Sequence, residues 1–258
     1  MIAGLRLHGS LTLVFLLCAC AGRAAPEAAI EPPGDPKTPK TRMLETGARV
    51  LQSNAPPSTL DVHLVGFHAA KEDPSHQMEA HHYCRQVNED FAQCALYDGD
   101  AAAANLVGIE YIISEKLFEA LPAQEKSYWH PHNYEILSGT LIGPGLPDAA
   151  EKAFMKRKMN SYGKTWHVWN SAPFGREGDR MPLGEAVLEW SFNRDGEALP
   201  AMIEARDRRM GLDTAGKRES RRDLVPLAHP QAGVDALKGR FDRPTQEIPG
   251  VMDEGAAR

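Results

Sequence analysis

The sequence predicts an α+β fold, a single domain with a mainly antiparallel sheet and interspersed helices. Strand-like segments follow one another across short turns, which is typical of antiparallel pairing. Helical segments stand between them without the strict alternation that a parallel sheet requires. The 258 residues, 42% apolar and 25% charged, are enough for one sizeable core. The net charge of −6 argues against general nucleic-acid binding, which needs a basic surface.

The N-terminus has the pattern of an export signal. Its apolar stretch, residues 11–17, is too short for a transmembrane helix. The following Leu17-Cys18-Ala19-Cys20 is similar to a bacterial lipobox, so we expect residues 1–19 to be a signal peptide and Cys20 to carry the lipid. The alternative is a plain secretory signal cut near Ala24-Ala25. Residues 20–40, rich in Pro and Ala, would tether a domain to the membrane of the cell envelope.

The folded domain is expected to span residues 41–225, and its first half contains the clearest elements. The predicted elements are a helix at 41–52, strands at 61–68, 77–87, 91–97 and 106–113, and a helix at 115–121. The strand at 106–113 has the strongest β propensity in the chain. Ser114 is placed to cap the helix that follows it, and Pro122 to close that helix.

The second half has weaker signals. A short helix is expected near residues 121–126, followed by a strand at 134–141, a helix at 148–160, strands at 162–169 and 185–192, and a helix at 200–211. Residues 226–258 have the composition of a loosely packed tail.

A hairpin is predicted around the turn Asn88-Glu89-Asp90. If the turn centres on Glu89, Cys84 lies directly opposite Cys94, with Cβ atoms about 4.5–5.5 Å apart. An exported chain permits a disulfide between them. Two small buried thiols are the alternative.

The segment Trp129-His130-Pro131-His132-Asn133-Tyr134-Glu135 is the most informative for chemistry. On an extended strand His130 and His132 would point to one face, as two ligands of a divalent transition metal or two proton-transfer groups would. The stretch is similar to the first cupin motif. It differs in having only two residues between His132 and Glu135, where cupins have three or four, so on a regular strand Glu135 would face away.

Further histidines precede this segment: His63, His68, His76, His81 and His82. Adjacent strand residues point to opposite faces, so only one of His81 and His82 can join a site. His82 shares its face with Ala80 and Cys84, and is either a core histidine or a site residue. His81 would pair with Glu79 on the more polar face.

Glu110 and His167 each have two interpretations. Glu110 lies in the most apolar strand, where it either points inward and needs a partner or forms the polar half of the alternation. The alternation favours the outward orientation. His167, between Trp166 and Trp169, either lines a ligand pocket or packs in an aromatic cluster.

A series of short motifs runs from His81 to Trp169. They are His81-His82-Tyr83-Cys84, Asn88-Glu89-Asp90, Gln93-Cys94 with Tyr97-Asp98, Gly108-Ile109-Glu110-Tyr111-Ile112-Ile113-Ser114, Trp129-His130-x-His132-x-Tyr134-Glu135 and Tyr162-Gly163-Lys164-Thr165-Trp166-His167-x-Trp169. In their order and spacing the chain resembles the oil-body-associated protein family. Plant members associate with seed lipid droplets, so the resemblance implies a tie to lipid surfaces and supplies no catalytic residue. Plant members look cytosolic and have the same cysteine pair, which weakens the case for a disulfide.

Two functions from different classes follow. The favoured one is an envelope lipoprotein that acts without catalysis at a lipid surface or on an envelope protein. The alternative is a metal-dependent or histidine-assisted enzyme using His130 and His132, helped by His81 or His82, Glu110 and His167. The sequence has no nucleophile elbow, phosphate loop or dinucleotide fingerprint.

Overall fold

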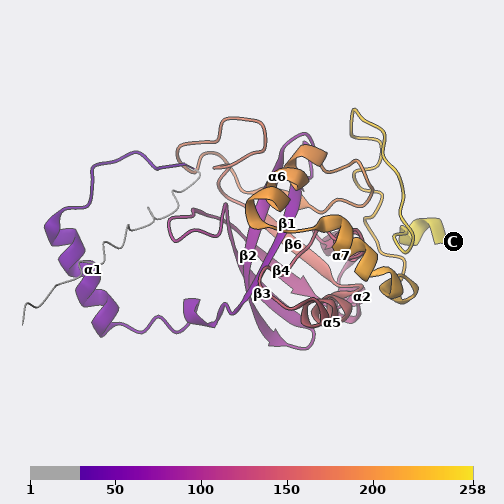
Figure 1. Ribbon diagram of the computed structural model, residues 1–258, viewed down its shortest axis with the longest axis horizontal. Helices are drawn as coiled ribbons and strands as arrows, with labels where there is room; N and C mark the ends of the chain where they lie inside the picture. Colours follow the sequence, from indigo (N-terminus) through magenta and orange to yellow (C-terminus); the bar gives the residue numbers. More distant parts are fainter. Residues whose placement is uncertain (1–29, 258) are drawn as a thin grey trace, which may run out of the picture.

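A closed antiparallel barrel is the centre of the structure, a computed structural model that describes residues 30–257. The strands are β1 (Val62–Ala70), β2 (Gln77–Asn88), β3 (Phe91–Tyr97), β4 (Leu106–Ile113), β5 (His130–Pro131), β6 (Tyr162–His167) and β7 (Val187–Trp190). They run in the order β4-β3-β2-β1-β7-β6, and a β4–β6 pairing closes the ring (Figure 1). The short β5 pairs with β6. The predicted α+β class with an antiparallel sheet is confirmed. The predicted signal peptide and the lipidated Cys20 lie outside the described residues.

The β2–β3 hairpin has the predicted register. Cys84 lies opposite Cys94, and a disulfide joins the two side chains. Together with Ala92, Leu96 and Ile112 they form an apolar cluster.

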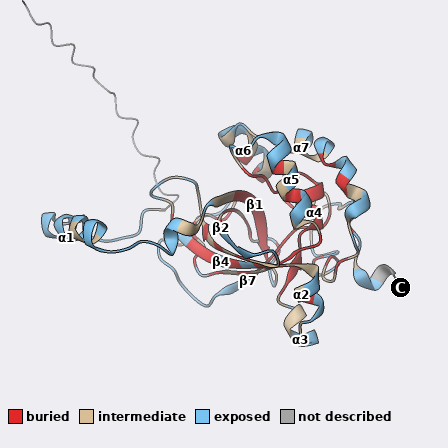
Figure 2. Ribbon diagram, turned by 90° about the horizontal axis from the view of Figure 1, so that it is seen from below, coloured by how far each residue is buried: buried red, intermediate tan, exposed pale blue. Residues whose placement is uncertain are grey.

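The helices lie outside the barrel. They are α1 (Pro39–Leu51), α2 (Glu115–Glu119), α3 (Ala123–Lys126), α4 (Asn133–Leu137), α5 (Asp148–Lys158), α6 (Pro200–Met210) and α7 (Thr214–Ser220), with 3-10 segments at Pro57–Thr59, Arg222–Leu227 and Glu254–Ala257. Ser114 caps α2 as predicted, accepting a hydrogen bond from the backbone N–H of Leu117. Helices α4 to α7 lie together on one side of the barrel (Figure 2).

The prediction of a strand at 134–141 is wrong, because this segment forms α4 and a tight turn. The backbone N–H of Asn133, at the start of α4, donates to Gln231 Oε1 at 3.0 Å. Arg221 Nη1 donates to the carbonyls of Ile136 and Leu141 at 2.8 and 3.0 Å. Side chains about 90 residues further along the chain therefore satisfy the backbone groups that a strand would have paired.

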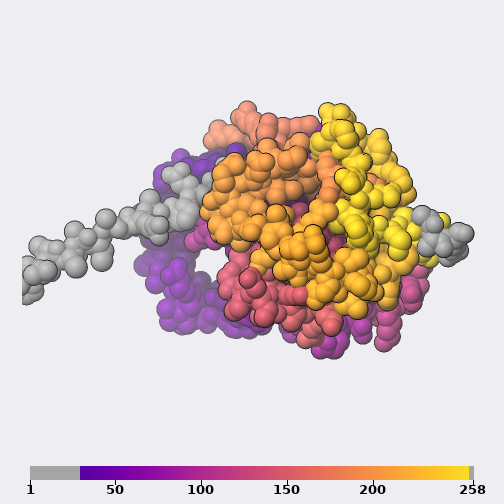
Figure 3. Space-filling model, turned by 45° about the vertical axis from the view of Figure 1, so that its right-hand side comes forward, coloured from indigo at the N-terminus to yellow at the C-terminus, as the bar shows by residue number. Residues whose placement is uncertain are grey.

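The C-terminal segment is not the loosely packed tail that its composition suggested. Val234, Leu237, Ile248 and Val251 are buried in the main hydrophobic core. In the space-filling view these last residues, in yellow, lie directly against the orange helical region (Figure 3). Residues after 225 therefore belong to the folded domain.

Helix α1 stands apart from the barrel (Figure 1), and none of its residues is buried. Its apolar side chains Met43, Leu44, Val50 and Leu51 are 60–84% exposed. Among residues 30–257, no helix is both long and apolar enough to cross a bilayer.

Candidate metal centre

A group of polar side chains fills the barrel interior. Its buried members are His68, His82, Glu110, His130, His132, His167 and Glu189. Glu110 is the central member, since three of the histidines place Nε2 close to its carboxylate.

Glu110 points inward, so the outward orientation that the alternation favoured is wrong. Its neighbours Ile109 and Tyr111 are 43% and 37% exposed, whereas Glu110 is only 2% exposed. Strand β4 therefore turns its polar residue into the barrel and two apolar ones outward. The carboxylate is accommodated because His82, His130 and His132 surround it.

His130 and His132 converge, although they do not share a regular strand. His130 lies in the two-residue β5, and His132 is the residue before α4. Their Nε2 atoms are 3.2 Å apart, and lie 3.6 Å and 3.2 Å from Glu110 Oε1. Nδ1 of His132 is 2.9 Å from Ser161 Oγ, a contact that orients the ring with Nε2 toward Glu110.

Gly163 of β6 lets these three donors approach the strand backbone closely. A Cβ atom built on Gly163 would lie 2.2 Å from Glu110 Oε1 and 2.6 Å from Nε2 of both His130 and His132. Any side chain here would collide with all three donor atoms. The glycine is therefore required where the two imidazoles and the carboxylate converge on β6.

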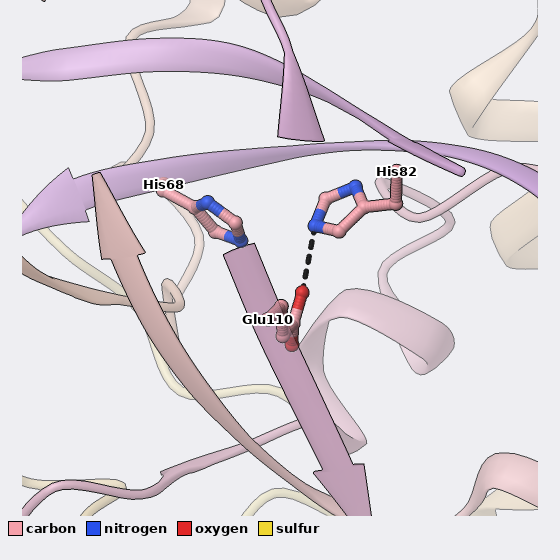
Figure 4. A group of neighbouring side chains, drawn as sticks. All are labelled: His68, His82 and Glu110. Atoms are coloured by element: carbon pink, nitrogen blue, oxygen red, sulfur yellow. Dashed lines mark ion pairs between the residues drawn. The ribbon is translucent and has the colours of Figure 1, made fainter. Parts of the chain in front are cut away.

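A second group shares Glu110. His82 Nε2 is 2.8 Å from Glu110 Oε2, the oxygen that does not face His130 and His132. His68, on β1, also points toward Glu110 (Figure 4). One ligand atom from each of His68, His82 and Glu110 lies within 4.8 Å of the other two, as do one each from Glu110, His130 and His132.

His167 faces the interior at the far end of this group. Its Nε2 is 3.3 Å from His68 Nδ1, and its Nδ1 is 3.9 Å from Glu189 Oε1. A small cavity of about 50 Å³ touches both His167 and Glu189. The ligand-site interpretation of His167 thus fits better than the aromatic cluster, because Trp166 lies on the opposite face of the strand.

Burial keeps several of these imidazoles neutral. It lowers the pKa of His132 to about 4 and that of His167 to about 3, and it holds the pKa of His68 well below its usual value. Burial alone would raise the pKa of Glu110, but His82, His130 and His132 hold it well below its usual range. Neutral imidazoles beside an ionised carboxylate are the protonation states that a transition metal requires.

Two further buried carboxyls flank the centre. Glu135 Oε2 is 3.9 Å from His132 Nε2, because α4 turns Glu135 back toward the histidines where a strand would have turned it away. Burial, reinforced by the Glu110 carboxylate, raises the pKa of Glu135 well above its usual value. Burial also raises the pKa of Glu189 to about 8.

His81 does not join the centre. Its Nε2 is 2.8 Å from Glu79 Oε1, and its Nδ1 is 3.1 Å from Nε2 of His63, a residue of β1. These contacts lie on the face of the sheet opposite to His82. The site candidates predicted from the sequence therefore include His82, Glu110, His130, His132 and His167. His68 was named only among the upstream histidines, and no role was given to Gly163 or Glu189. A hairpin across the polar loop 71–75 pairs β1 with β2 and places Leu64 opposite His82. His68 is four residues after Leu64 on β1, so it lies on the same face as His82.

Comparison with known proteins identifies relatives over most of the chain. The family model described as a protein of unknown function (DUF1264) matches residues 54–225. Oil body-associated protein 1B of Arabidopsis thaliana is 38% identical over 205 residues, covering 80% of this chain and 82% of the relative. Oil body-associated protein 2A of Arabidopsis thaliana is 40% identical, covering 74% and 76%, and oil body-associated protein 1A of Zea mays is 34% identical, covering 89% and 96%. No solved structure matches the chain.

Proposed function

This chain belongs to the oil body-associated protein family, described as DUF1264, and we propose that it is a member whose barrel binds a divalent transition-metal ion. The ligands are Glu110, His130 and His132. The observation that carries the proposal is the convergence of their donor atoms beside the backbone of Gly163.

The chemistry of the donors agrees with this assignment. Two imidazoles and one carboxylate are a common ligand set for zinc and non-haem iron, and three protein ligands leave positions free on the ion. A metal in such a site activates bound water or polarises a substrate oxygen. Ser161 supplies the outer contact that metal-binding histidines usually make. The proposed function of this chain is therefore that of a metal-dependent protein with the capacity for catalysis.

Elemental analysis tests the proposal directly. The full chain, purified in detergent without chelator or polyhistidine tag, is compared with His130→Ala/His132→Ala. His229→Ala is the matched control, because the exposed imidazole of His229 pairs with Glu115 and does not belong to the barrel interior. We expect a stoichiometric transition metal in the wild type and the control, and a metal content lower by one ion per chain in the double variant. A folded wild type that binds no Zn²⁺, Mn²⁺ or Fe²⁺ on reconstitution contradicts the proposal.

A second function is favoured by the exposed apolar face of α1. We propose that a lipid on Cys20 anchors the chain to a membrane of the cell envelope, and that α1 then contacts the lipid surface. Leu44 and Leu51 are 60% and 84% exposed, and Arg42 and Arg49 provide charge for anionic headgroups. The names of the relatives place those proteins at oil bodies, which also have a lipid surface.

Flotation with anionic phospholipid vesicles tests this second function. We expect Cys20→Ser to remove the chain from the membrane fraction of cells, and Leu44→Asp/Leu51→Asp to weaken vesicle binding of the unlipidated chain. If Leu44→Asp/Leu51→Asp floats as the wild type does, α1 is not a lipid contact. Crosslinking to an envelope protein would then identify a protein partner in its place.

A further inference from the structure

We propose that the barrel binds two metal ions and that Glu110 bridges them. This inference rests on the proposed function, since it adds a second ion beside the one held by His130 and His132. The second ion is held by His68 and His82.

The two oxygens of Glu110 face different histidines. Oε2 is 2.8 Å from Nε2 of His82, while Oε1 is 3.2 Å from Nε2 of His132 and 3.6 Å from that of His130. A bridging carboxylate divides its oxygens in this way, because each oxygen ligates one ion.

The donors fall into two groups. Metal–nitrogen and metal–oxygen bonds of about 2.1 Å require the donors of one ion to lie within about 4.2 Å of one another. The donor atoms of His68, His82 and Glu110 lie within 4.8 Å of one another, and so do those of Glu110, His130 and His132, with Glu110 as the shared member. Small shifts would close each group on its own ion.

Outer contacts support both ends of this centre. His68 Nδ1 contacts His167 Nε2 at 3.3 Å, so its Nε2 is free for an ion, and His167 in turn approaches Glu189. At the other end Ser161 Oγ contacts Nδ1 of His132, so Nε2 of that ring also points toward its ion. Each ion would thus have one histidine whose ring is fixed by an interior partner. Nδ1 of His82 and of His130 has no partner among the described residues, so those rings are held only through Nε2.

Two ions a few ångströms apart would share a ligand as well as Glu110. Their free positions face the same interior space, so a hydroxide or a small oxyanion would bridge them. The chemical class implied is hydrolytic or oxygen chemistry on small molecules.

Metal counting on the metal-free full chain, reconstituted with Mn²⁺ or Zn²⁺ in detergent, distinguishes this inference from the proposed function. We expect two ions per wild-type chain. One ion should remain in His68→Ala/His82→Ala and one in His130→Ala/His132→Ala, while Glu110→Gln weakens both. His229→Ala is again the control.

A measurement on the wild type alone covers the case in which the variants fail to fold. Two Mn²⁺ ions joined by a carboxylate give an exchange-coupled electron paramagnetic resonance spectrum, which a single ion does not. One ion per chain with an uncoupled spectrum overturns the bridged centre and leaves the proposed function intact. An ion count of zero overturns both.

Discussion

Replacing Gly163 by alanine is the sharpest test of the proposed metal site, because it disturbs the three ligands without changing any of them. The added Cβ would lie 2.2 Å from Glu110 Oε1 and 2.6 Å from Nε2 of His130 and His132. Real Cβ atoms do not approach other heavy atoms more closely than 3.0 Å, so the oxygen must retreat by about 0.8 Å and each nitrogen by about 0.4 Å.

These displacements set the expected size of the effect. A metal site tolerates ligand shifts of only about 0.2 Å, so all three donors of Gly163→Ala lie beyond that range. Loss of a single outer contact typically costs about 10–100-fold in affinity. We therefore expect Gly163→Ala to weaken Zn²⁺ binding by at least about 100-fold, or about 2.8 kcal/mol. The metal-free variant should lose only about 1–3 kcal/mol of unfolding free energy, as other overpacked interiors do.

The assay is competition for Zn²⁺ with a chromophoric chelator, beside urea unfolding of the metal-free protein. Gly143→Ala is the matched control, because its Cβ would meet Leu146 Cδ1 at 2.8 Å and Leu64 Cδ2 at 3.6 Å, neither of which belongs to a proposed ligand. Wild-type Zn²⁺ affinity in Gly163→Ala would refute the assigned site. Equal loss of affinity in both variants would show that general packing is the cause.

Three further outcomes are expected. In metal-free protein, Glu189→Gln should gain stability relative to wild type as the pH rises from about 4.5 to 8. Burial raises the pKa of Glu189 to about 8 in the folded state, so over that interval the unfolded chain has released a proton that the folded chain keeps. The wild type therefore loses about 1.4 kcal/mol of stability per pH unit; a pH-independent difference in urea midpoint contradicts this. Cys84→Ala/Cys94→Ala removes a crosslink of sequence separation 10 and should cost about 3 kcal/mol by chain entropy, measured against oxidised wild type, whereas reduced wild type should be about as stable as the variant. Leu237→Ala should cost about 2–5 kcal/mol, since Leu237 is fully buried; a surface-like cost below about 0.5 kcal/mol would contradict the packed C-terminus.

Local patterns were sufficient for most elements of the barrel. The hairpin around Glu89 was predictable because its turn is short, and counting from a turn centred on Glu89 gives the register that places Cys84 opposite Cys94. The register shift between Gln86 and Asn88 lies beside the turn and leaves that opposition intact. Ser114 and the β propensity of β4 likewise fixed where that strand ends and α2 begins. These features depend on neighbours within about ten residues, which the sequence shows directly.

The candidate site was only partly predictable. His82 and His167 could be placed on a face by strand parity, and the His130-x-His132 spacing marked the two ligands. The reason given for their convergence was wrong, because β5 ends at Pro131 and His132 begins the turn into α4. The predicted orientation of Glu110 was also wrong. Hydrophobic alternation predicts that Ile109 is buried and Glu110 exposed, and it does not take account of a polar barrel interior.

The sequence by itself thus determined the antiparallel α+β class, the order of the strands along the chain, the Cys84–Cys94 opposition and most histidines of the centre. Closure of β4 onto β6 decided the rest, because it brings Glu110 beside Gly163 and turns both toward the same interior. Distant side chains decided α4, since Arg221 and Gln231 satisfy its backbone groups and so turn Glu135 toward His132. Contacts between residues tens of positions apart depend on how the whole chain packs, so local sequence patterns do not predict them.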